Sequence, residues 1–289
     1  MKVSVSRRVF LGFNYLFFGL FILLCVYPIW YIFISSISSG SGVGQFFIPI
    51  NPTLSNYSKV FKLEGMGVAF RNSLVRTLLG TGLTVLACMF LGFLFTKQEM
   101  PFRKSLYRIL IVTMYVSGGL IPTYLTVKSL GLVDKWPIVF ILGCVSVRNI
   151  VIVRTFIQSN IPESLIEAAF LDGCSHTVFL TRIVVPLSLP VISVIALFTA
   201  VGQWNSWFTA MIYLRDDSMM PLQMVLRRIL LLNEAYASGN GGVQGGYGQS
   251  SADQVKYAVM IVSTVPILCV YPFVQKYFEK GVMIGAVKG

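Results

Sequence analysis

Hydrogen-bonding and aromatic side chains lie together in one otherwise apolar stretch, GQWNSWFTAMIYL at residues 202–214. Gln203 and Asn205 supply amide donors and acceptors, and Trp204 and Trp207 supply flat apolar faces. A sugar offers hydroxyls and weakly apolar ring faces, so its binding sites combine these two kinds of group. The stretch therefore predicts contact with a sugar-like solute. The alternative is structural, because tryptophan also anchors helices at membrane interfaces and amides bond neighbouring helices.

Two further polar residues, Arg148 and Asn149, interrupt an apolar run at residues 136–153. Lipid penalises such groups, so they are expected to face a helix-bundle interior or a water-filled cavity. Contact with the solute and, for Arg148, a structural salt bridge are equally compatible with this position. Arg76 lies early in another apolar run. Its long side chain is expected to extend so that the guanidinium reaches the outer membrane surface.

Several kinds of chemistry are excluded by what the sequence lacks. There is no G-x-x-x-x-G-K-[ST] phosphate loop, so the chain itself is not expected to hydrolyse ATP or to be an enzyme. The single histidine, His176, has no partner ligands nearby, and the five cysteines lack CxxC spacing. No metal site or other cofactor is therefore expected in this chain.

The composition is that of a helical, polytopic membrane protein. Apolar residues make up 55% of the chain and charged residues 12%, against about 25% charged in soluble domains. The apolar runs are continuous, which favours helices over a barrel, since about 20 apolar residues span a bilayer. The net charge of +12 lacks any nucleic-acid-binding motif, so we assign it to membrane lipid and not to nucleic acid.

Six spans are predicted, and the chain is treated as one domain over residues 1–289. The spans are residues 9–34, 72–95, 106–127, 136–153, 186–214 and 257–278. Basic residues gather in the amino-terminal segment, in the turn after the second span and in the tail, which places both termini in the cytoplasm. Residues 158–185, between spans four and five, are then cytoplasmic as well.

The outer loop between spans five and six has two parts. The stretch PLQMVLRRILLL at residues 221–232 predicts an amphipathic helix with Arg227 and Arg228 on its polar side. A glycine-rich run at residues 238–251 follows and predicts a flexible segment. The apolar side can pack on the membrane surface while the arginines face water or an acidic partner surface; a helix that only caps the bundle is the alternative.

The cytoplasmic segment at 158–185 has the pattern of two short helices joined by a sharp turn. Pro162 suits the first turn of a helix, and Glu163 and Glu167 lie near its positive end. Asp172-Gly173 is a turn dipeptide, and a second amphipathic helix is expected at about residues 175–184. Such a shape, lying across the membrane surface, is suited to docking another protein.

This segment resembles the EAA signature of bacterial ABC importer permeases. The match comprises Glu167, Ala168, Ala169, Asp172, Gly173, Phe179, Ile183, Pro186 and Pro190, with Val185 where the family usually has leucine. In that family the segment is the coupling helix that docks on an ATPase subunit. The resemblance therefore implies that Glu167, Ala168, Ala169, Asp172, Gly173 and Phe179 couple this chain to an ATPase.

The rest of the chain resembles carbohydrate importers of the maltose-transporter type, through the Trp-Asn element and the ending GVMIGAVKG. In detail it resembles the complex polysaccharide and oligosaccharide subgroup that includes alginate permeases. This implies a heterodimer with a second, related permease, two ATPase subunits that bind ATP and Mg, and an extracytoplasmic solute-binding protein. By the same resemblance, the outer loop at residues 221–251 is expected to engage that binding protein. It also implies the inner membrane of a bacterium and an oligosaccharide substrate, acidic in the alginate-type case.

Two alternatives come from other classes. A secondary transporter for a small polar solute would need acids or broken helices at the membrane midplane, and no predicted span has Asp or Glu near its centre. A structural membrane scaffold would leave the coupling pattern as an accident. Copurification with an ATPase distinguishes the importer from both.

Overall fold

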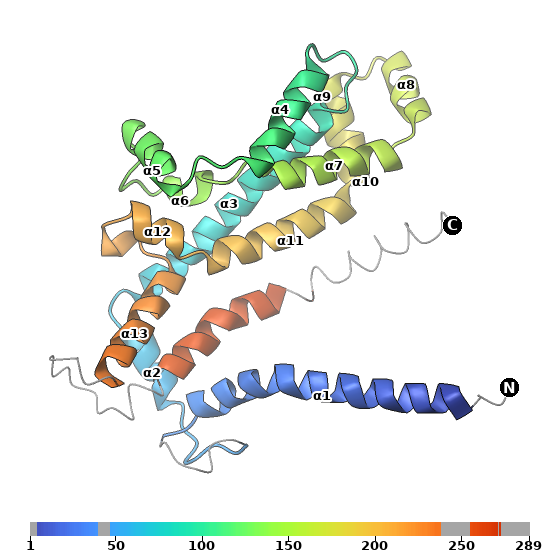
Figure 1. Cartoon of the computed structure of the whole chain (residues 1–289). Coiled ribbons are helices and arrows are strands. Elements are labelled where there is room, and N and C mark those ends of the chain that lie inside the picture. The colour runs from blue at the N-terminus through green and yellow to red at the C-terminus, as the bar shows by residue number, and fades with distance from the viewer. Residues whose placement is uncertain (1–4, 40–46, 238–254, 271, 273–289) are drawn as a thin grey trace. The chain divides into compact units, whose positions relative to one another are not determined.

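The structure is a computed structural model that describes residues 5–39, 47–237, 255–270 and 272. Over this part of the chain it is all-helical, with one isolated bridge between Ser38 and Pro52 in place of any sheet (Figure 1). The chain divides into two compact units, one of residues 1–66 with 225–265 and the other of residues 67–224 with 266–289. Each unit is described by itself below.

The first unit contains the long helix α1 (Val5–Ser36) and the short helix α2 (Ser55–Lys62). No side chain between residues 7 and 30 is buried, so α1 presents apolar groups all round, as a helix that contacts lipid or other chains does. The carboxyl end of α1 is fixed by Asn56, whose amide donates to the carbonyls of Ser36 and Ser38 at 3.0 and 2.8 Å. Tyr31 meets Tyr257 of the helix Val255–Val270 at a ring distance of 5.8 Å.

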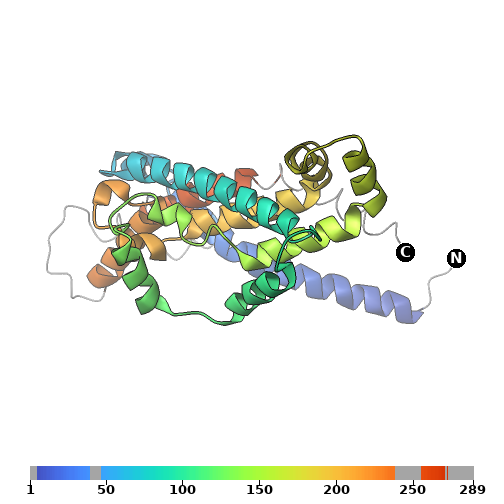
Figure 2. The same ribbon diagram turned by 90° about the horizontal axis from the view of Figure 1, so that it is seen from above.

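The second unit is built around α3 (Met66–Leu94), beside which lie α7 (Val147–Asn160) and α11 (Leu189–Asn205) (Figures 1 and 2). The remaining helices of this unit are shorter. They are α4 (Arg103–Tyr115), α5 (Leu120–Ser129), α6 (Ile138–Ile141), α8 (Glu163–Leu171), α9 (His176–Phe179), α10 (Val185–Leu187) and α12 (Phe208–Tyr213). The π-helical turn η1 (Leu180–Val184) joins α9 to α10, and the 3-10 turn η2 (Asp217–Met219) precedes α13 (Leu222–Ala237), which begins in this unit.

Within the described residues, two helices are long and apolar enough to cross a membrane, Arg7–Ser36 and Met66–Leu94. They correspond to the first two predicted spans. Counting each of two bent pairs as one span raises the number to four: Arg103–Tyr115 with Leu120–Ser129, bent by 118°, and His176–Leu187 with Leu189–Asn205, bent by 79°.

Helices are interrupted within the residues of three predicted spans. The third breaks at Gly119, whose φ of +84° ends regular helix geometry between α4 and α5. The fourth breaks at Gly143, with φ of +88°, so that α6 has only four residues before α7 begins. The fifth is interrupted twice, by the 79° bend at Ser188 between α10 and α11 and at Ser206 between α11 and α12. The sixth is helical over Val255–Val270, and its last residues lie outside the described part.

The core of the second unit lies at one end of α3, where it packs on α7 and on the segment around α9. Its buried residues are Cys88, Met89, Phe93, Phe95, Ile150, Val153, Ile157, Ile161, Ala169, Phe179, Val184, Val191 and Ile195. Gly92 allows the approach of α3 to α7, because a Cβ there would lie 2.5 Å from Cγ1 of Val153. Burial of this apolar set holds the segment at 158–185, described next, against α3.

Candidate functional site

The segment at 158–185 has the predicted helix, turn and second helix. Helix α8 begins after Pro162 and ends at a turn in which Gly173 has a φ of +77°. Gly173 and Cys174 donate their backbone N–H groups to the carbonyls of Phe170 and Ala169, both at 3.0 Å, and this closes the end of α8. The hydroxyl of Ser175 then accepts from the N–H of Val178 at 3.4 Å and starts α9. In both ribbon views α8 protrudes beyond the end of α7 (Figures 1 and 2).

One side of this segment faces outward and the other is anchored in the chain. Glu167, Ala168, Asp172 and Gly173 are exposed, and the neighbouring Leu171 is 88% exposed. Ala169 and Phe179, by contrast, are 8% and 1% exposed and belong to the core. The six residues of the coupling pattern thus divide into four that another protein can touch and two that hold the segment in place.

The anchor is an aromatic cluster around a lysine. The rings of Phe93 on α3, Phe170 on α8 and Phe179 on α9 meet at 5.7–6.2 Å between centroids. The ammonium of Lys97, three residues after α3 ends, lies over all three rings, 4.7 Å from Phe93, 4.5 Å from Phe170 and 5.1 Å from Phe179. A cation over an aromatic face is attracted by the ring quadrupole, so Lys97 ties the end of α3 to both helices of the segment.

Burial lowers the pKa of Lys97 below its ordinary value, and the nearby Glu99 partly offsets this by raising it. A second contact lies beside the first, because a carboxylate oxygen of Glu99 is 3.6 Å from Nε2 of His176. Both side chains are mostly exposed, so water screens this pair and its contribution is small. The connection from α3 to α4 therefore holds the segment mainly through Lys97.

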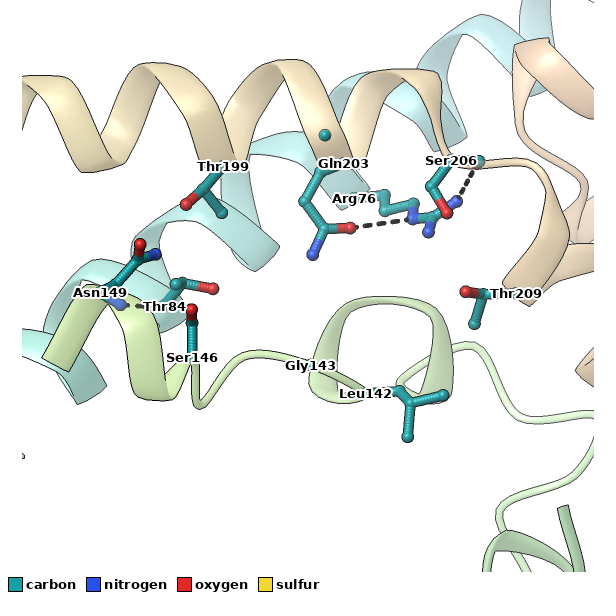
Figure 3. Close-up of a pocket in the computed structure, with 11 residues that line it drawn as sticks. Arg76, Thr84, Leu142, Gly143, Ser146, Asn149, Thr199, Gln203, Ser206 and Thr209 are labelled. Atoms are coloured by element: carbon teal, nitrogen blue, oxygen red, sulfur yellow. Dashed lines mark hydrogen bonds between the residues drawn. The ribbon is translucent and has the colours of Figure 1, made fainter. Parts of the chain in front are cut away.

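A polar cavity of about 250 Å³ lies elsewhere in the same unit, between α3, the broken stretch around Gly143 and α11 (Figure 3). Its lining is mostly groups that can form hydrogen bonds. The lining residues are Arg76, Thr84, Leu142, Gly143, Ser146, Asn149, Thr199, Gly202, Gln203, Ser206 and Thr209. The breaks at Gly143 and Ser206 place irregular backbone beside this cavity, as is tolerated at membrane depth where backbone lines water or protein.

Arg76 is the one charged side chain of this lining, and it is only 3% exposed. Its Nε donates to the carbonyl of Val139 at 3.0 Å and to Oε1 of Gln203 at 3.3 Å. Its Nη1 donates to the carbonyl of Ser206 at 2.7 Å, where α11 ends. The expectation that Arg76 reaches the outer membrane surface was therefore wrong. Carbonyls freed by the helix breaks gave it partners inside the chain.

The structure brings two of the six predicted pathway residues to this cavity. Asn149 and Gln203 line it, with Gln203 also holding Arg76. The other four do not line it: Arg148 and Asn205 are exposed, Trp207 is half-buried, and Trp204 is buried with its ring edge-on to Phe70 at 5.8 Å.

The sequence alone does not identify the remaining residues of the polar cavity or the partners of Lys97 in the aromatic cluster. The hydroxyls of Thr84, Ser146, Thr199 and Thr209 are scattered through apolar runs, and no local pattern joins them. Lys97 is one of the basic residues in the turn after the second predicted span, and the sequence predicts for it only an effect on membrane orientation. A signal for it existed, since Phe93 precedes it by four residues, but its other two rings come from another part of the chain.

Comparison with known proteins gives close relatives along the whole chain. Protein LplC of Bacillus subtilis strain 168 is 38% identical over 100% of this chain and 98% of its own length. The polygalacturonan/rhamnogalacturonan transport system permease protein YtcP of the same organism is 34% identical, over 99% of this chain and 100% of its own. No family model matches the chain.

Solved structures agree in fold. A crystal structure of a bacterial ABC transporter involved in the import of the acidic polysaccharide alginate contains a chain with a TM-score of 0.86 and 31% identity. The match covers 96% of this chain and 99% of that one. A bacterial alginate ABC transporter in complex with its pentasaccharide-bound periplasmic protein matches at a TM-score of 0.59 and 15% identity, which shows the fold alone. Identity above 30% along the whole length shows that the chain belongs to the permease family of ABC importers for carbohydrates.

Proposed function

We propose that this chain is a permease subunit of a binding-protein-dependent ABC importer whose substrate is an oligosaccharide. One relative, 34% identical, is a permease for polygalacturonan or rhamnogalacturonan. The solved structure with 31% identity is of an ABC transporter involved in the import of alginate. Such a permease holds no ATPase site; ATP and Mg bind to two partner ATPase subunits. A second, related permease completes the membrane part, and an extracytoplasmic solute-binding protein delivers the substrate.

In this proposal the whole chain, residues 1–289, acts as one transmembrane domain in a bacterial inner membrane. Six passes are formed by α1, α3, three broken spans and the segment that begins with Val255–Val270. Both termini then lie in the cytoplasm, as the basic residues favour. The carboxyl-terminal Gly-Ala-Val-Lys-Gly tail and the glycine-rich run 238–251 lie outside the described residues, and the run keeps its proposed role toward the binding protein.

The coupling segment is the proposed contact with an ATPase. Its outward side offers an acidic group at Glu167, a small residue at Ala168 and an apolar tip at Leu171, which is 88% exposed. An apolar side chain that exposed suits insertion into a hydrophobic groove of a partner. Asp172 and Gly173 hold the tip in position through the turn after α8.

Motion of the ATPase would reach the spans through the anchored side of the segment. Phe179 and Ala169 are packed in the core, and Lys97 lies over Phe93, Phe170 and Phe179 at once. A displacement of α8 is thus transmitted to the end of α3 by contact. Phe179 acts in this proposal as an anchor and not as a surface that the ATPase touches.

The solute pathway is proposed to pass the polar cavity. Asn149 and Gln203 line it. The other proposed pathway residues, Trp204, Asn205, Trp207 and Arg148, lie within four positions of these two in the sequence. Amides and hydroxyls around a cavity of about 250 Å³ can exchange hydrogen bonds with successive sugar hydroxyls. The cavity belongs to one permease alone, so the second permease would supply the facing side.

The coupling role rests on one observation: the end of α8 at Leu171 is exposed, while Ala169 and Phe179 of the same segment are packed in the core. A substitution at Gly173 tests this role. A leucine at Gly173 strains a turn that needs positive φ, by about 1–2 kcal/mol. Gly131, with φ of +67° and no atom within 4 Å of its Cβ position, is a matched control away from the segment. We expect Gly173→Leu to abolish most substrate-stimulated ATP hydrolysis in the reconstituted complex, and Gly131→Leu to leave it near the unaltered level. Equal hydrolysis in the two variants would contradict the assignment.

A further inference from the structure

Arg76 carries a positive charge into the interior of the unit without an acidic partner. It is 3% exposed, and none of the residues that the structure describes pairs a carboxylate with it. Its three hydrogen bonds go to neutral groups, the carbonyls of Val139 and Ser206 and the amide oxygen of Gln203. A buried charge is stable when it is paired, so this arrangement leaves a guanidinium with its charge uncompensated.

The guanidinium also has a free donor at the cavity. Nε and Nη1 are occupied, whereas Nη2 makes no hydrogen bond to any described residue. Figure 3 shows the guanidinium held between Gln203 and Ser206 at the edge of the cavity, with Thr209 on the opposite side. Because carbonyls fix the other nitrogens, the free N–H groups are preorganised and lose little freedom when a ligand binds.

Neutral hydrogen-bonding groups complete the surroundings. Thr199 and Thr209 have hydroxyls without a hydrogen-bond partner among the described residues, and Asn149 adds an amide. No acidic side chain lines the cavity. An anion entering this space meets a cation and hydroxyl donors and no like charge, and an uncharged sugar meets only the hydroxyls and the amides.

We propose that Arg76 is a specificity-determining residue that receives a carboxylate of an acidic sugar, a uronate, as the substrate passes the cavity. The free Nη2 donates to the carboxylate, while Thr199, Thr209 and Asn149 bond the hydroxyls of the same residue. This inference rests on the proposed function, because it requires that the cavity lies on the substrate pathway. The other interpretation is that Arg76 only ties α6 to the end of α11 through Val139 and Ser206.

The test compares an acidic ligand with its neutral ester. Uptake of labelled trigalacturonate and of its methyl ester is measured in proteoliposomes that contain the complete transporter and one binding protein. Because the binding protein is unchanged among variants, a change in the ratio of acid to ester uptake reports on the permease. We expect Arg76→Gln to lower this ratio about 10-fold or more, while uptake of the ester stays within about 3-fold. Arg71→Gln, an exposed arginine on the same helix, is the control and should leave the ratio unchanged.

A second variant keeps every hydrogen bond of Arg76. Thr209→Asp places a carboxylate in the cavity, where it can pair with the guanidinium, and should lower acid uptake about 10-fold with little effect on the ester. An unchanged ratio in both variants overturns the proposal, as does equal loss of both ligands in Arg76→Gln together with a harmless Thr209→Asp, which identifies a structural tie. If the unaltered transporter imports neither these nor any other oligosaccharide, the proposed function itself fails.

Discussion

The two ends of α3 are built on opposite principles. Around Arg76 the helix meets its neighbours through directed hydrogen bonds and leaves a cavity of about 250 Å³. Around Phe93 it meets them through buried apolar side chains and a tilted ring pair with Phe179. Hydrogen bonds across a space can be exchanged for bonds to a solute, whereas close packing resists deformation and transmits displacement. The contrast supports the proposal that solute binds near one end of α3 and that motion is transmitted at the other.

Two glycines on α3 give the sharpest form of this contrast. A Cβ at Gly92 would meet Cβ of Val153 at 2.8 Å and the backbone nitrogen of Arg154 at 3.3 Å, and neither atom can move away alone. A Cβ at Gly80 would meet only the far end of the Gln203 side chain, at 2.8 Å. The packed end is therefore intolerant of one added methyl group, and the cavity end can yield by moving a flexible side chain.

Alanine at these two glycines is expected to have the largest effect of the changes considered. Gly92→Ala should destabilise the assembled complex by about 1–3 kcal/mol through overpacking, and Gly80→Ala should change stability by less than about 1 kcal/mol. Gly80→Ala should instead weaken transport, because the Gln203 side chain must move away from Arg76. Thermal unfolding and uptake of the two purified variants provide the measurement. A larger loss of stability in Gly80→Ala would break the comparison.

Lys97→Met should weaken coupling at the packed end without removing the protein from the membrane. Each ring contact of a cation is worth about 0.5–1 kcal/mol at an exposed site, or about 2- to 5-fold in an equilibrium. We expect substrate-stimulated ATP hydrolysis to fall several-fold, with ATPase subunits still copurifying. Lys97→Arg keeps the charge and should retain most of the stimulation. If both variants behave like the unaltered complex, Lys97 does not transmit motion.

Asn149→Ala tests the cavity end with a smaller expected effect. Loss of one hydrogen bond to a sugar hydroxyl costs about 0.5–1.5 kcal/mol, so the substrate concentration for half-maximal transport should rise about 2- to 13-fold. Maximal stimulated hydrolysis should stay unchanged, because the packed end is untouched. Asn160→Ala, on an exposed amide at the far end of the same helix, is the control. If maximal hydrolysis falls while the substrate concentration for half-maximal transport stays the same, Asn149 acts in coupling to the ATPase and not in binding the solute.

The smallest expected effect is on the pH dependence of substrate-stimulated ATP hydrolysis, through Lys97 at the packed end of α3. Because burial lowers the folded pKa of Lys97, its charge opposes folding below that pKa, and the opposition disappears as pH rises to the ordinary lysine value. The same rise removes the ammonium from the three rings. Stimulated hydrolysis should therefore decline at a lower alkaline pH in the unaltered complex than in Lys97→Arg, whose guanidinium stays charged. Superimposable pH profiles would show that the charge over the rings is not used.

Local patterns predicted the parts of this molecule that depend on neighbours in sequence. The helix, turn and helix at 163–179 follow from Pro162, Asp172-Gly173 and Ser175, and α1 and α3 follow from long apolar runs. The helix breaks are harder to predict from the sequence, because Gly143 lies in a run whose hydropathy looks continuous. Only the third predicted span carried a visible signal, in Gly118-Gly119 and Pro122.

The site itself depends on contacts between distant residues. Arg76 bonds to Val139 and Ser206, which are 63 and 130 positions away, so the sequence around Arg76 suggested a surface position. Lys97 likewise owes its role to Phe170 and Phe179. The lipid argument predicted interior positions for Arg148 and Asn149; Asn149 lines the cavity, whereas Arg148 is exposed, and contact of Asn149 or Gln203 with a solute stays a prediction.

The contact of the α8 tip with an ATPase subunit is the central claim, and cysteine cross-linking tests it most directly. In a complex without native cysteines, Leu171→Cys is paired with single cysteines around the groove of the ATPase subunit. Leu130→Cys, 66% exposed in the connection after α5, is the control. We predict that Leu171→Cys cross-links to the ATPase under mild oxidation, with a yield that changes when ATP binds, and that Leu130→Cys does not. Cross-linking of Leu130→Cys, or none from Leu171→Cys at any groove position, would contradict the account.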